Sequence, residues 1–134
     1  MSAKLSSPKT MPQRAGYSQM AEVTKGKLVL IAGQVPHDTD DRLVGEGDFA
    51  AQVDQVFKNV DAAVRAAGGN FRDVVKINNY CVASVTPEQM RAFRDVRDRY
   101  VNTAAPPVST FIYVSRLVQP GRLFEMDAIA VIDG

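Results

Sequence analysis

Two carboxylates stand two positions apart in the last apolar run of the chain, and they are its sharpest chemical signal. Glu125 and Asp127 interrupt residues 122–132, which are otherwise mostly apolar. Side chains of a β-strand alternate between its faces, so both carboxylates point to the same face, roughly 7 Å apart along the chain. Burial raises the pKa of a carboxyl group and makes it a general acid or base. Alternatively, both carboxylates satisfy backbone groups or ion pairs at a contact between subunits.

Other reactive residue types are scarce. The 134 residues include one His and one Cys, which excludes a disulfide within the chain and a zinc site built from several such ligands. His37 stands in a polar loop and is interpreted as a solvated histidine in preference to a catalytic one. Cys81 lies in a predicted strand and is interpreted as a core residue. The aspartates within residues 38–41 lack the spacing of a calcium loop, so no metal site is expected.

Arginine side chains crowd the segment 91–99. Arg94 lies beside the apolar face of this segment, where its guanidinium could reach a cleft and bind a carboxylate through two hydrogen bonds. The alternative is an ion pair with Asp98, one helical turn further on. Sixteen Lys and Arg against fifteen Asp and Glu give a net charge of +1, so nucleic acid is not expected as a partner.

Two helices are predicted from the spacing of apolar residues. The first covers residues 49–67, with Asp48 as N-cap and Gly68-Gly69 as its end. The second begins after Thr86, because Pro87 is tolerated in the first turn, where its missing N–H costs nothing.

Strands are predicted at residues 28–35, 73–82, 109–118 and 122–132. Turn residues at 25–26 predict a hairpin into the first of these strands. Pro120-Gly121 predicts that the last two form an antiparallel pair. The resulting order, β-β-α-β-α-β-β, describes an α+β fold with two helices on one face of a mostly antiparallel sheet.

The strands at 28–35 and 122–132 are apolar on both faces. Two helices cover one face of a sheet, so the other face needs a second cover, and a neighbouring subunit is expected to supply it. A single domain is predicted over residues 15–134, preceded by a flexible N-terminal arm over residues 1–14. No apolar run is long enough for a membrane helix, no signal peptide is evident, and a cytoplasmic location is expected.

An ordered set of short segments resembles the Rid/YjgF family of reactive-intermediate deaminases, also described as the endoribonuclease L-PSP family. These segments are residues 28–36, residues 49–52 with Asn59, residues 66–68, residues 73–76 and residues 125–131. The resemblance implies a chorismate-mutase-like fold and a homotrimer with small-molecule clefts between subunits. It implies hydrolysis of imines or enamines, such as 2-aminoacrylate, to a keto acid and ammonia, without a cofactor.

The resemblance also assigns cleft residues. Tyr17, Gly33 and Glu125 match family positions, with Glu125 placing the attacking water. Ala32 stands where many members have serine, and Arg94 where many have asparagine.

One departure concerns substrate binding. Family members hold the substrate carboxylate with the arginine of a Pro-x-Arg-Ser segment, whereas this chain has Val108 before Ser109. Valine supplies neither the charge nor the hydrogen bonds, which argues against the standard 2-aminoacrylate activity.

Two hypotheses about function follow. In the first, the chain is an enzyme that hydrolyses an imine, with the anion held by Arg94 or by backbone amides near Thr110. In the second, it is a non-catalytic module that binds or senses a metabolite.

Overall fold

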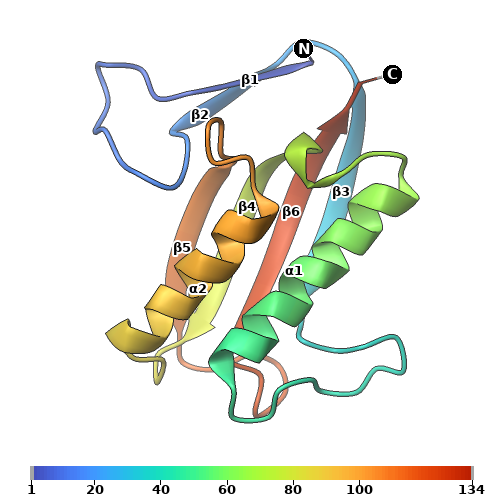
Figure 1. Ribbon diagram of the computed structural model, residues 1–134, viewed down its shortest axis with the longest axis vertical. Helices are drawn as coiled ribbons and strands as arrows, with labels where there is room; N and C mark the ends of the chain where they lie inside the picture. Colours follow the sequence, from blue (N-terminus) through green and yellow to red (C-terminus); the bar gives the residue numbers. More distant parts are fainter. Residues whose placement is uncertain (1, 134) are drawn as a thin grey trace.

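The computed structural model describes residues 2–133 and shows an α+β fold, as predicted from the sequence (Figure 1). The strands are β1 (Ala3–Ser6), β2 (Met20–Val23), β3 (Lys27–Gln34), β4 (Val74–Val82), β5 (Val108–Val114) and β6 (Phe124–Ile132). The helices are α1 (Phe49–Ala66) and α2 (Pro87–Tyr100), with a short 3-10 turn at Phe71–Asp73 before β4.

Local signals define both helices. Asp48 accepts a hydrogen bond from the Ala51 N–H at 3.1 Å and caps α1. Gly68 follows α1 with a φ of 97°, a conformation in which glycine carries no side-chain penalty. At α2, Thr86 and Gln89 form a reciprocal capping box. The helix predictions are therefore confirmed to within a residue or two.

Strand pairing differs from the prediction. The main sheet has the order β3-β6-β4-β5, with antiparallel β3–β6 and β6–β4 pairs and a parallel β4–β5 pair. The predicted antiparallel pair of the last two strands is wrong, because β4 lies between β5 and β6. The hairpin predicted at residues 25–26 is wrong as well, because β3 pairs with β6 and β2 pairs with β1.

The pair formed by β1 and β2 lies at one end of the molecule, away from the helices (Figure 1). It places a strand inside residues 1–14, where the sequence suggested a loose arm. The reason is a non-local partner: residues 3–6 run antiparallel to residues 20–23 and bond through their backbones.

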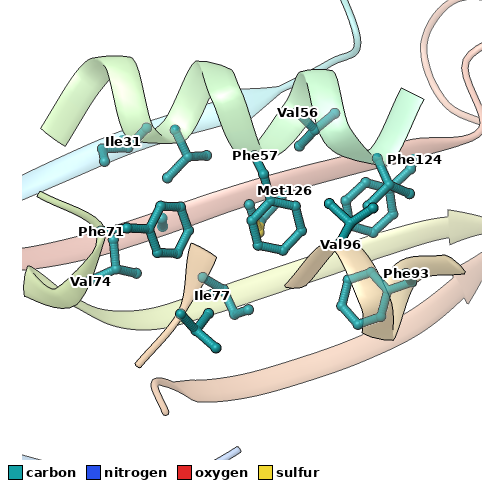
Figure 2. Close-up of a cluster of buried hydrophobic side chains, with 14 of the residues drawn as sticks. Ile31, Val56, Phe57, Phe71, Val74, Ile77, Phe93, Val96, Phe124 and Met126 are labelled. Atoms are coloured by element: carbon teal, nitrogen blue, oxygen red, sulfur yellow. The ribbon is translucent and has the colours of Figure 1, made fainter. Parts of the chain in front are cut away.

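Apolar side chains fill the space between the two helices and one face of the sheet (Figure 2). Aromatic rings dominate this core: Phe57 stacks on Phe71, with ring centroids 5.6 Å apart, and Phe93 lies 5.5 Å from Phe124. Met126 is fully buried beneath them. From Phe124 to Ala130, every second residue of β6 is buried here.

The other face of the sheet carries exposed apolar side chains. Leu28 is 63% exposed, Leu30 is 71% exposed, and Ile112 on β5 is 45% exposed. We call this the open face of the sheet; Glu125 and Asp127 belong to it, because they alternate with buried residues of β6. No helix within residues 2–133 is long and apolar enough to span a membrane.

Candidate functional site

Glu125 and Gly33 meet at the open face, where β6 and β3 lie side by side. A Cβ added to Gly33 would overlap the Oε2 atom of Glu125, so only glycine leaves room for this carboxylate. The strand is irregular here, with a register shift between Ile31 and Gln34. Ala32 is exposed within the same irregularity, and its carbonyl accepts a hydrogen bond from the Gln34 side chain. Three of the predicted site residues therefore lie together.

The two carboxylates of β6 have different surroundings. Asp127 accepts hydrogen bonds from Asn78 Nδ2 and from the Tyr80 hydroxyl, each at 2.8 Å. The first bond occupies Oδ1 and the second Oδ2, so Asp127 holds β4 to β6. Asp127 is thus satisfied by two side chains of its own chain, and not by the backbone groups or ion pairs at a subunit contact that the alternative interpretation proposed.

Glu125 is half-buried, and within residues 2–133 no side-chain hydrogen bond or ion pair engages its carboxylate. Burial raises the pKa of Glu125, and the nearby charge of Asp127 raises it further. The Tyr80 pKa is raised as well, first by its hydrogen bond to Asp127. Glu125 is thus a carboxylate without a hydrogen-bond partner among residues 2–133, and its raised pKa makes its ionised form a stronger base than an exposed glutamate.

A cavity of about 310 Å³ adjoins Glu125. Its walls come from two loops, residues 35–41 and residues 117–122. Asn59 of α1 holds the first loop through hydrogen bonds to the carbonyls of Val35, at 3.1 Å, and His37, at 2.9 Å.

His37 corrects the sequence interpretation of a solvated histidine. Its side chain is buried, with 8% of the residue exposed. Its Nδ1 atom lies 2.7 Å from Asp41 Oδ1, and its Nε2 accepts a hydrogen bond from Arg122 Nε at 2.9 Å. Both ring nitrogens are therefore engaged, which removes His37 as a free base.

The remaining predicted site residues form a second group near the start of β5. The Ser18 backbone N–H donates to the Pro107 carbonyl at 3.2 Å, and Ser18 forms an isolated bridge with Val108, so Tyr17 immediately precedes the residue paired with Val108. Arg94 lies on α2 and lines a separate cavity of about 500 Å³ with Gly16 and Pro106.

Arg94 does not form the ion pair with Asp98 that was considered as an alternative. Asp98 instead accepts a hydrogen bond from Arg97 Nε at 2.9 Å.

The side chains of Ser109 and Thr110, near the start of β5, lie on opposite faces of the sheet. Asn79 Nδ2 donates to the Ser109 hydroxyl at 3.0 Å, which directs Ser109 toward the helix side of the sheet. Thr110 is exposed and aligns with Asn78 on the open face.

β4 separates the two groups of residues within one chain (Figure 1). Val108 is aligned with Lys76 of β4, and Glu125 with Tyr80. The four positions from Lys76 to Tyr80 span roughly 13 Å of extended strand, and β5 and β6 flank β4 on opposite sides. One chain therefore does not bring Val108 and Glu125 into one cleft.

Several residues around Glu125 were missed from the sequence: Tyr80, Asn78 and Arg122. Tyr80 and Asn78 share one parity of a predicted strand, which could have placed them on one face. Arg122 gave no signal, because its position depends on the non-local contact with His37.

Cys81 is fully buried, and burial raises the pKa of its thiol to about 11. It is a core residue, as interpreted from the sequence. Residues 2–133 contain no cluster of three or more His, Cys, Asp or Glu side chains suited to a metal ion.

A mixed sheet backed by two helices, with a glycine facing a free glutamate on the open face, defines an α+β protein of the YjgF type. Residues 8–132 match the family model described as Endoribonuclease L-PSP, and the chain belongs to this Rid/YjgF family.

Two curated relatives illustrate the similarity. Protein DfrA of Myxococcus xanthus is 35% identical over 116 residues, covering 86% of this chain and 84% of the relative. The 2-iminobutanoate/2-iminopropanoate deaminase of Salmonella typhimurium is 32% identical over 114 residues, covering 81% and 83%.

A solved structure of a Rid-family protein, YyfB from Yersinia pestis, superposes with a TM-score of 0.86 at 30% identity. The superposition covers 98% of this chain and 100% of that one.

Proposed function

We propose that the protein is a cytoplasmic homotrimer that hydrolyses a small imine or enamine to a carbonyl compound and ammonia. The observation that carries this proposal is the free Glu125 carboxylate, which faces Gly33 and lines a cavity. The name of the Salmonella relative, an iminobutanoate and iminopropanoate deaminase, supports the substrate class.

Glu125 acts on water in this proposal. When the imine is protonated, attack by water gives a neutral carbinolamine and leaves the water proton on Glu125. The proton then passes to the amine nitrogen, and ammonia leaves with the electrons of the C–N bond. The hydroxyl proton goes to solvent as the carbonyl forms. An enamine such as 2-aminoacrylate enters as its imine tautomer.

A complete cleft requires a second subunit. Within one chain the Glu125 group and the Tyr17–Val108 group lie on opposite sides of β4. The exposed leucines of the open face favour a neighbouring copy as its cover. In the trimer, the second group of one subunit, with Arg94, faces the Glu125 of the next.

The test generates 2-aminoacrylate, and separately bulkier amino-acid imines, and measures keto-acid formation. We expect Glu125→Ala to abolish the acceleration, whereas Glu46→Ala, which removes an exposed loop carboxylate, leaves it intact. Activity should fall on acidification, because the base must be deprotonated. The raised pKa of Glu125 places this fall at a higher pH than for an exposed glutamate. Equal rates for wild type and Glu125→Ala would contradict the proposal.

A second candidate function is metabolite binding without turnover, and Val108 favours it. A valine at this position removes the guanidinium with which the family holds a carboxylate. Saturable binding of a keto acid, with no acceleration for any imine tested, would select this function.

A further inference from the structure

The guanidinium that lies in the same cavity as Glu125 belongs to Arg122 and not to Arg94. Arg122 lines the cavity of about 310 Å³ together with Glu125, whereas Arg94 lines the separate one beside Gly16. Arg122 lies two residues before the start of β6, in the loop that lines one side of the cavity.

Arg122 is held in place by two hydrogen bonds of its guanidinium. Its Nε donates to His37 Nε2 at 2.9 Å, and its Nη1 donates to the Pro120 carbonyl at 2.8 Å. His37 in turn lies 2.7 Å from Asp41 through its other ring nitrogen. Because His37 is buried, the series of contacts from Asp41 through His37 to Arg122 orients the guanidinium within the cavity wall.

The Nη2 atom of the guanidinium remains available within residues 2–133. A guanidinium has five N–H donors, and within residues 2–133 the hydrogen bonds of the Arg122 side chain are those to His37 and Pro120. No carboxylate of these residues forms an ion pair with Arg122. Asp41 and Glu125 also line this cavity, but neither carboxylate pairs directly with Arg122, so the guanidinium is the group of the cavity wall that favours binding of an anion.

We infer that Arg122 binds the carboxylate of the substrate. It would do so in place of the family arginine whose position Val108 occupies. The expected ligand is a small 2-imino or 2-oxo carboxylate. Binding of the 2-oxo carboxylate is independent of the proposed function, whereas hydrolysis of the 2-imino carboxylate rests on it. In such a molecule the imine carbon is bonded directly to the carboxylate carbon. An anion held by Arg122 therefore keeps the reacting carbon inside the cavity that Glu125 lines.

The experiment measures binding of pyruvate, a stable 2-oxo carboxylate, and of its neutral amide, pyruvamide, to the full chain by calorimetry. We expect Arg122→Gln to weaken pyruvate binding at least about tenfold, as for the loss of a charged hydrogen-bond partner. Pyruvamide affinity should stay unchanged. Arg122→Lys keeps the charge without the planar pair of donors and should give an intermediate loss. Arg42→Gln removes an exposed arginine outside the cavity and should change neither affinity.

Unchanged pyruvate affinity in Arg122→Gln would overturn the inference, as would no pyruvate binding by the wild type. If pyruvate binding were lost in Arg94→Gln and kept in Arg122→Gln, the inference would also be overturned, because the anion would then bind to Arg94 of α2. If Arg122→Gln does not fold, the inference is tested by pyruvate and pyruvamide binding to the wild type and to Arg122→Lys. A wild type that binds pyruvate no more tightly than pyruvamide contradicts the inference, and a selective loss of pyruvate in Arg122→Lys supports it.

The two proposals fail separately. Turnover that depends on Glu125, combined with pyruvate binding that ignores Arg122, refutes only the role of Arg122. Binding of pyruvate through Arg122 without turnover of any imine refutes only the hydrolysis.

Discussion

At the scale of single residues, hydrogen bonding distinguishes two carboxylates that the sequence treats alike. Glu125 and Asp127 share a strand and a face, yet Asp127 is occupied by Asn78 and Tyr80. Glu125 instead faces a glycine and keeps its carboxylate free. The proposed chemistry therefore rests on Glu125, whereas Asp127 joins β4 to β6.

Gly33→Ala tests the fit between Gly33 and Glu125. The added methyl group would overlap Glu125 Oε2, which is the mobile end of a side chain, so the carboxylate moves and the backbone stays. We expect activity to fall at least about tenfold while the thermal midpoint stays close to that of wild type. Full activity in the variant would show that the observed position of Glu125 is not the catalytic one.

At the scale of elements, the helices could be predicted from the sequence and the strand pairing could not. Caps and apolar periodicity act within a few residues, so Asp48 and Thr86 mark the helix starts by themselves. The chain bends at residues 25–26 and turns at residues 120–121. The pairing of strands depends on how apolar side chains are buried across the whole sheet, and in this sheet β4 lies between β5 and β6.

Gln52 of α1 joins two loops to the helix, and its replacement should weaken the fold. This fully buried side chain donates to the Gly45 and Gly121 carbonyls, each at 3.0 Å, and accepts from the Leu123 N–H at 2.8 Å. Gln52→Leu leaves these backbone groups without partners, so we expect a loss of about 2–4 kcal/mol in urea unfolding.

Lys58→Leu, on the exposed side of the same helix, is the matched control and should change stability by less than about 0.5 kcal/mol. A Gln52→Leu protein as stable as this control would show that the bonds of Gln52 contribute little.

At the scale of the whole molecule, the sheet has one face covered by helices and one face of exposed apolar residues. Leu30 is 71% exposed at the centre of β3. Leaving several such side chains in water is costly, at about 25 cal/mol for each Å² of apolar surface. The exposed apolar residues of the open face therefore support the proposed assembly of subunits on this face.

Leu30→Asp should dissociate the assembly, because a carboxylate on this face would be buried without a partner. Light scattering is expected to give an oligomer for the wild type and a smaller species for Leu30→Asp. Met11→Asp, at an apolar residue outside the sheet that is 37% exposed, serves as the control and should remain assembled. A monomeric wild type would refute the trimer.

The sequence by itself determined the two helices, the two-sided apolar character of the sheet, and the family. Each of these depends on residue type and local spacing. Only the tertiary structure decided that β4 keeps Val108 apart from Glu125, that His37 is buried, and that Arg122 shares the cavity of Glu125. These outcomes depend on contacts between residues far apart in the chain, such as the 85-residue separation of His37 and Arg122, which local patterns do not encode.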